Sequence, residues 1–198
     1  QALATSQAEH RYVLGRDYTK GLGAGGNPEI GKNAAEASIE DLKEIVQGAN
    51  MVFIAAGMGG GTGTGAAPIV AKIAREAGAL TIAIVTRPFS FEGNSRKVKA
   101  VEGLNKLKNE VDSIIVVSND KLMMMNGNKS IADAFAESDR VLSQSVKTIT
   151  DLVKTFNERV LKGEFNGNKA LYKEELQKIK TTIKGIRKSV GPQNLFTK

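Results

Sequence analysis

The chain has 198 residues, of which 41% are hydrophobic, a length and composition that suit one sizeable domain with a buried core. Its formal net charge of +7 arises in residues 154–198, which hold 11 Lys+Arg against 4 Asp+Glu, whereas residues 1–153 hold 17 of each. The lack of cysteine and the single histidine exclude disulfides, thiol chemistry, a histidine metal site and a Ser/His/Asp triad, and no apolar run is long enough for a membrane span.

The first fifty residues predict a strand, a glycine-rich loop and a helix. Residues 12–15 are read as a short edge strand. Residues 21–26 hold four glycines and no hydrophobic period, which is typical of a loop, and taken alone they favour a plain surface turn. Ser38 with Asp41 three residues later predicts a capping box for a helix that ends at Gly48. One face of this helix is expected to hold Ile39, Leu42, Ile45 and Val46.

The next stretch joins a buried strand to a helix through glycines. Residues 51–56 are apolar at every position, which predicts a parallel strand covered on both faces. A helical pattern over residues 66–77 follows, with Pro68 in its first turn. Glycine backbone N–H groups, the helix N-terminus and the hydroxyls of Thr62 and Thr64 all suit a phosphate ligand. The inward face of the helix is expected to hold Ile69, Ile73 and Ala77.

Two further strands complete a strand–helix–strand pattern. Residues 80–85 predict a second buried strand, and residues 111–117 predict a third that ends at Asn119. Glu92 and Arg96 begin the helix between them, and their spacing is accounted for either by a salt bridge or by contacts to a nucleotide. The order predicts an α/β fold, a mostly parallel sheet with helices on both faces and its glycine loops at the strands' C-terminal ends. The apolar positions of the intervening helix are Val98, Val101, Leu104 and Leu107.

The last third is predicted to be helical. Methionines 123–125 are expected to fill a core or groove, and residues 126–128 to form a turn. A long helix is predicted over residues 129–153, and a basic helical segment over residues 169–188. An ordinary amphipathic helix with a solvated basic side explains this segment better than an acidic partner, anionic membrane or nucleic acid. The inner faces are expected to hold Phe135, Val141, Leu142, Val146, Ile149 and Val153, and then Leu171, Leu176, Ile179 and Ile183.

The glycine-rich stretch can be compared with the known types of phosphate-binding loop. No Gly-Lys-Ser/Thr follows it, so it is not a Walker loop. Gly61, Gly63 and Ala66 fit the dinucleotide fingerprint, but the next strand ends in Thr-Arg-Pro, where that fingerprint requires an acid for the ribose. An NADP-type dehydrogenase is therefore a disfavoured alternative. Residues 59–65, Gly-Gly-Gly-Thr-Gly-Thr-Gly, match the tubulin/FtsZ signature without a mismatch. The chain resembles this family, and in particular its FtsZ branch, over about residues 1–153.

The resemblance implies a Rossmann-like GTP-binding domain over residues 1–128, a central helix over 129–153 and a tail of unknown role over 154–198. It implies that the domain binds GTP or GDP, with Mg²⁺ on the phosphates. No residue is assigned to hold the metal ion. Segments 21–29, 86–93 and 118–122 resemble the family's γ-phosphate, ribose-side and guanine-side loops. The residues expected to bind the nucleotide are Ala24, Gly25, Gly26, Gly60, Gly61, Thr62, Gly63, Thr64, Gly65, Glu92, Arg96, Asn119, Phe135 and Asp139.

The resemblance also implies a filament-forming GTPase of prokaryotic cell division. It is expected in the cytoplasm, where it associates with copies of itself or with intact FtsZ subunits. Two expected parts are missing from these residues: a first glycine loop before residue 1, and the family's acidic Asn-x-Asp-x-x-Asp loop after residue 153. No catalytic residue is therefore assigned, and the chain alone is expected to be inactive. The alternative is a non-hydrolysing fragment that binds or caps filaments of an intact homologue.

Overall fold

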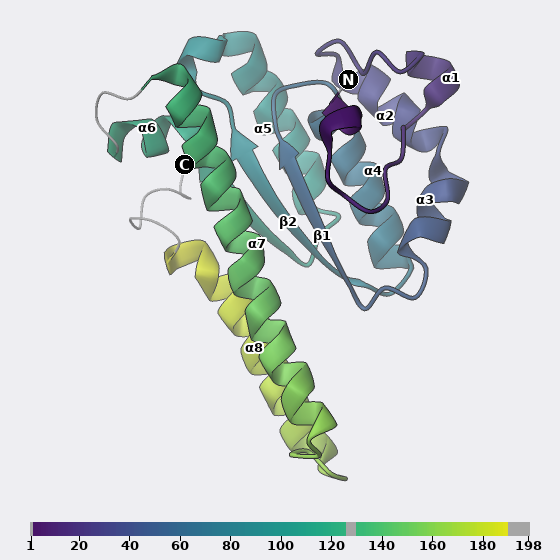
Figure 1. Ribbon diagram of the computed structural model, residues 1–198, viewed down its shortest axis with the longest axis vertical. Coiled ribbons are helices and arrows are strands. Elements are labelled where there is room, and N and C mark those ends of the chain that lie inside the picture. The colour runs from purple at the N-terminus through teal and green to yellow at the C-terminus, as the bar shows by residue number, and fades with distance from the viewer. Residues whose placement is uncertain (1, 126–129, 190–198) are drawn as a thin grey trace.

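The computed structural model describes residues 2–125 and 130–189 and has a parallel sheet at its centre (Figure 1). The strands β1 (Met51–Gly57), β2 (Leu80–Arg87) and β3 (Ser113–Ser118) lie in the order β1-β2-β3, and both pairs are parallel. The helices are η1 (Ala2–Thr5), α1 (Arg16–Thr19), α2 (Pro28–Glu36), α3 (Ile39–Val46), α4 (Thr62–Glu76), η2 (Ser90–Glu92), α5 (Asn94–Lys108), α6 (Asn119–Met125), α7 (Ile131–Leu161) and α8 (Lys169–Ser189).

Helices cover both faces of the sheet, which confirms the predicted α/β fold. On one face, α4 and α5 pack on Ile54, Ala83 and Val85, and on the other, α7 and α8 pack on Ile82 and Ile84. Helices α2 and α3 lie outside α4 and form a third cluster with it (Figure 1). Strand β2, in the middle, is buried at six consecutive positions.

The edge strand β1 is less covered than its apolar sequence predicts. Ala55 is exposed, and Met51, Val52 and Phe53 are half-buried. The expectation of cover on both faces is wrong at these positions, because β1 has a strand neighbour on one side only within the described part of the chain. An apolar run indicates that a segment is a strand of the sheet, but it does not indicate whether that strand lies at the edge.

Helix α4 begins four residues earlier than predicted, at Thr62, so most of the glycine motif is helical. Pro68 therefore lies inside the helix and not in its first turn. There it leaves the carbonyl of Thr64 without its usual N–H partner. Ala77, expected to face inward, is exposed at the C-cap.

The apolar positions of α5 are only partly buried: Leu104 and Leu107 pack in the core, whereas the two valines do not. Val98 and Val101 are 50% and 45% exposed, whereas Ala100, Gly103 and Leu107 are buried. The reason is a close approach to α4: a Cβ on Gly103 would lie 2.4 Å from Cγ2 of Thr64. Small residues set this contact at Ala100 and Gly103, and Val98 and Val101 face solvent.

The N-terminal segment is attached through side chains expected to cap a helix. Residues 12–15 form no strand. Ser38 makes no capping bond; its Oγ accepts a 2.8 Å hydrogen bond from the backbone N–H of Gly15. The hydroxyl of Tyr12 donates to the carboxylate of Asp41. The predicted capping box is wrong because both of its side chains bind residues far away in sequence.

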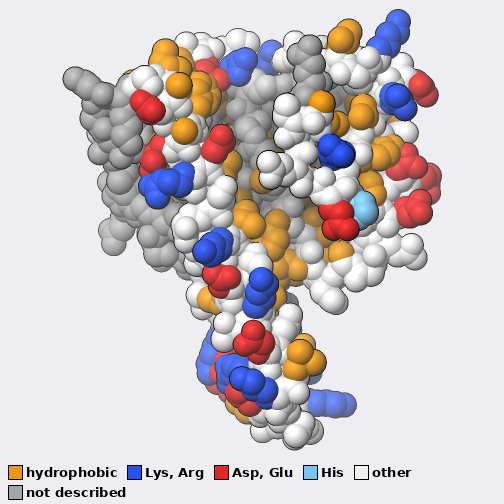
Figure 2. All heavy atoms as spheres, viewed as in Figure 1, with side chains coloured by type: hydrophobic (Ala, Val, Ile, Leu, Met, Phe, Trp, Pro, Cys, Tyr) orange, Lys and Arg blue, Asp and Glu red, His pale blue; other side chains and the backbone are white. Residues whose placement is uncertain are grey.

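The helices α7 and α8 form an antiparallel hairpin that extends beyond the sheet (Figure 1). Helix α7 continues through residues 153 and 154, where the charge balance changes, and ends at Leu161. Near the turn, Phe156, Phe165 and Tyr172 pack together with ring centroids 5.4–6.0 Å apart. Figure 2 shows acidic and basic side chains side by side on this projecting end. The basic segment is thus a packed amphipathic helix.

Two predictions near α6 have different outcomes. Met124 is 82% exposed and Met123 is 40% exposed, so the expectation that they fill a core or groove is wrong. They lie on the open side of a short helix whose buried contact is made by Leu122. The predicted turn at residues 126–128 lies outside the described residues.

Replacing Ile183 with aspartate is expected to detach α8 from the sheet. Ile183 is 2% exposed and belongs to the cluster that includes Ile82 and Ile115. Loss of this apolar contact and burial of a carboxylate should cost at least about 3 kcal/mol. Urea unfolding measures the cost. Thr181→Asp, at an exposed position of the same helix, is the control, and equal stability of both variants would contradict this packing.

Candidate functional site

The predicted nucleotide-binding segments meet at one edge of the sheet. Strands β1, β2 and β3 are parallel, so the loops after Gly57, Arg87 and Ser118 all leave the sheet at its C-terminal edge. Ligands of open α/β sheets bind at this edge. The search for a site therefore begins with these loops.

The first glycine loop is a tight turn at the N-terminus of α2. The N–H of Asn27 donates to the carbonyl of Ala24 at 2.9 Å, with φ of +55° at Gly25 and +75° at Gly26. Positive φ at both central positions defines a type I′ turn, which favours glycine. The side chain of Asn27 caps α2 by accepting a hydrogen bond from the N–H of Glu29 at 3.0 Å.

The second glycine loop forms the uncapped N-terminus of α4. Gly61 is the N-cap, and no side chain caps it. A Cβ on Gly61 would lie 2.6 Å from Cβ of Ala24 and 2.9 Å from the backbone N of Asn27, so the two loops touch. In the described part of the chain, the N–H groups of Gly25, Gly26, Gly60 and Gly61 make no hydrogen bond.

Two helix N-termini thus lie against each other, with free N–H groups around them. Each helix contributes about half a positive charge at this end. Unsatisfied N–H groups and the helix dipole together attract anions such as phosphate. Phosphate binding was expected both from the motif at Gly60 to Gly65 and from the likeness of residues 21–29 to the family's γ-phosphate loop, and the fold adds the contact between the two loops.

Several glycines of the motif are required by packing. A Cβ would lie 1.9 Å from the carbonyl oxygen of Pro28 if placed on Gly65, and 2.4 Å from that of Gly57 if placed on Gly63. A Cβ on Gly60, in contrast, would meet nothing within 4 Å. Gly63 and Gly65 therefore set how closely α4 approaches β1 and α2, and Gly60 faces open space.

The two threonines of the motif also differ. Thr64 is 3% exposed, and its Oγ1 accepts a 2.8 Å hydrogen bond from the N–H of Gly59. Thr62 is exposed, in the first turn of α4. Thr62 can thus present its hydroxyl to a ligand, whereas Thr64 supports the loop from inside.

The residues predicted on the guanine side come together around Ser138. Asn119 is 4% exposed, and its Oδ1 accepts a 2.8 Å hydrogen bond from the hydroxyl of Ser138 on α7. Asp139 follows Ser138 and is exposed. Phe135, one turn earlier, is 41% exposed and packs edge-on against Phe89 with ring centroids 4.9 Å apart. An amide, a carboxylate and an aromatic ring thus lie on neighbouring surfaces.

On the ribose side, Glu92 and Arg96 form a salt bridge of 2.9 Å. The other oxygen of Glu92 accepts a 2.8 Å hydrogen bond from the N–H of Phe89. A residue that the sequence reading did not single out joins this loop to the guanine side: Asp120 accepts hydrogen bonds from the N–H and hydroxyl of Ser90, at 2.5 and 2.6 Å. Its sequence signal was its place next to Asn119 in residues 118–122, the segment expected on the guanine side.

Within residues 2–125 and 130–189, no group of three or more His, Cys, Asp or Glu is placed to hold a metal. No helix in these ranges is long and apolar enough to cross a membrane.

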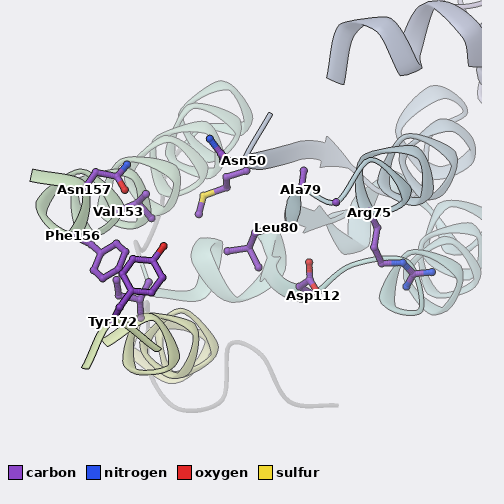
Figure 3. A pocket seen from close by; sticks show the side chains of 12 residues that line it. Asn50, Arg75, Ala79, Leu80, Asp112, Val153, Phe156, Asn157 and Tyr172 are labelled. Atoms are coloured by element: carbon purple, nitrogen blue, oxygen red, sulfur yellow. The ribbon is translucent and has the colours of Figure 1, made fainter. Parts of the chain in front are cut away.

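A hollow of about 580 Å³ lies at the other edge of the sheet, where the strands begin (Figure 3). Phe156 and Tyr172 of the hairpin form one side, and Leu80 and Asp112 the other. Asp112 already accepts a 2.8 Å hydrogen bond from the N–H of Thr81. None of the predicted nucleotide-binding residues lines this hollow, so it is separate from the candidate site.

Comparison with known proteins agrees with the geometry. Residues 1–127 match the family model described as the GTPase domain of the Tubulin/FtsZ family. An FtsZ dimer from M. jannaschii is 46% identical, with a TM-score of 0.74 over 76% of this chain and 44% of that chain. The GTPγS-bound protofilament of CetZ2 from Haloferax volcanii is 26% identical, with a TM-score of 0.63 over 73% of this chain and 44% of that one. The chain thus spans less than half the length of these structures.

Proposed function

This chain belongs to the tubulin/FtsZ family of GTPase domains, and we propose that it binds GTP along the C-terminal edge of its sheet. One observation carries the proposal: the uncapped N-terminus of α4, formed by the Gly-Gly-Gly-Thr-Gly-Thr-Gly motif, touches the glycine turn at the N-terminus of α2. Free N–H groups from two helices suit a chain of phosphates better than a single small anion.

The proposed roles follow the three strand ends. Backbone N–H groups of Gly25, Gly26, Gly60 and Gly61 and the hydroxyl of Thr62 hold the phosphates, and Mg²⁺ is bound mainly by phosphate oxygens. Ala24, Gly63, Thr64 and Gly65 shape this loop pair from behind. Glu92 and Arg96 lie beside the ribose. The amide of Asn119 and the carboxylate of Asp139 read the guanine edge, and Phe135 packs against the base.

We also propose that the chain associates with copies of itself or with intact FtsZ-type subunits, in the cytoplasm and at the site of cell division. The supporting observations are that one similar structure is an FtsZ dimer and another is a CetZ2 protofilament. The second candidate function is a non-hydrolysing module that binds or caps such filaments. It is favoured by the absence of the family's acidic loop sequence between residues 154 and 198.

The base-reading role predicts that the chain prefers GTP to ATP and that Asn119→Ala removes most of this preference. An unpaired buried polar group costs about 1–3 kcal/mol, or roughly a factor of 5 to 150. Titration calorimetry with both nucleotides measures it. Ser138→Ala is the matched control, because it removes the same hydrogen bond but keeps the amide. Equal affinity of the parent chain for GTP and ATP would contradict the assignment.

A further inference from the structure

One cation lies beside the two glycine loops and has no part in the roles assigned above. Lys99, on α5, donates a 2.9 Å hydrogen bond from Nζ to the backbone carbonyl of Gly26. Gly26 is the second central residue of the type I′ turn and directly precedes Asn27, which contacts Gly61. The ammonium group is therefore held next to the point where the two helix N-termini meet.

Lys99 forms no ion pair in the described part of the chain, although Glu29 and Glu102 line the same cavity. Its one hydrogen bond goes to a neutral carbonyl. Lys32, which lines the same small cavity of about 220 Å³, is by contrast paired with Glu29 at 3.5 Å and Glu36 at 3.7 Å. A half-buried lysine that bonds only to a neutral carbonyl, beside free N–H groups, is an arrangement that an anion would complete.

We propose that Lys99 binds the terminal phosphate of GTP and makes the site prefer GTP to GDP. The inference rests on the proposed nucleotide site and adds a side-chain cation to its backbone donors. In the structure the ammonium group donates to the carbonyl of Gly26. When the nucleotide binds, the ammonium group turns from this carbonyl to the phosphate oxygens, and a hydrogen bond between two charged groups replaces a weaker one to a neutral oxygen.

The test compares the affinities of the full chain and its variants for GTP and GDP by calorimetry. Lys99→Met keeps the aliphatic stem and removes the charge. It should weaken GTP binding by about tenfold or more and GDP binding by less than about threefold. Lys99→Arg should keep most of the preference for GTP. Lys106→Met, seven residues along the same helix and lining the same cavity, is the control and should leave both affinities unchanged.

Each result separates the explanations. Equal weakening of GTP and GDP by Lys99→Met would mean that Lys99 only fixes the loop, and would overturn the inference. Unchanged affinities would do the same, as would an equally selective loss in Lys106→Met, which would indicate a diffuse charge effect. If the parent chain binds neither nucleotide, the proposed function fails together with the inference. If the parent chain binds GTP but Lys99→Met shows no selective loss of GTP affinity, the inference fails and the proposed function stands.

Discussion

Replacing Gly65 with alanine is expected to lower the melting temperature of the chain by about 6–12 °C. The added Cβ would lie 1.9 Å from the carbonyl oxygen of Pro28 and 2.6 Å from the backbone N of Lys32. Both neighbours are backbone atoms of α2, so the helices must move apart. Overpacking of this kind costs about 1–3 kcal/mol or more, whereas alanine in place of glycine gains about 1 kcal/mol in helix propensity. Because the contact is this short, we expect overpacking at the upper end, about 4 kcal/mol, and hence a net loss of about 3 kcal/mol.

Gly60→Ala is the matched control for this prediction. The Cβ on Gly60 would meet no atom within 4 Å, so the melting temperature should change by less than about 2 °C. The same methyl group would project from a backbone that we propose lies against phosphate, so GTP affinity should fall although the fold remains. Thermal unfolding by circular dichroism and calorimetry give the two readouts. An unchanged or higher melting temperature for Gly65→Ala would contradict the close crossing of α2 and α4.

The strands and the position of the candidate site could be predicted from the sequence because they depend on local patterns. Each strand is a short apolar run, and the glycine motif follows β1 and continues into the first turn of α4. The C-terminal edge then follows from the parallel order alone. Even so, the motif did not reveal which glycines face a ligand, because that depends on how closely α2 and β1 approach α4.

Features set by contacts between distant residues could not be predicted. Ser38 is a good helix-capping residue, but its hydroxyl binds Gly15, 23 residues away. The apolar stripe of α5 includes Val98, which the close contact at Gly103 turns toward solvent. Periodicity identifies a stripe, and the partner element decides which stripe is buried.

The purified chain is expected to release no phosphate from GTP above the rate without protein. The resemblance implies a reaction in which an acidic loop of one subunit activates water against the nucleotide of the next. Positioned acid–base groups of this kind contribute about 10²–10⁴-fold to the rate. Residues 154–198 contain four acids, at positions 158, 164, 174 and 175, without the family's spacing.

The structure adds a second reason to expect no turnover, because three of these acids form ion pairs with basic side chains of the same hairpin. Glu164 lies 2.7 Å from Arg159, Glu175 lies 3.2 Å from Arg159, and Glu174 lies 2.9 Å from Lys178. Lys178, and then Arg159, lowers the pKa of the Glu175 carboxyl, which makes it a weaker base. Association of two chains would therefore bring no free, aligned carboxylate to the phosphates from these three positions.

Phosphate release measured over a wide range of protein concentration tests the expectation of no turnover. A rate per chain that rises with concentration would contradict it and would show that copies of this chain complete one another's sites. A flat baseline together with measurable GTP binding would favour the non-hydrolysing module.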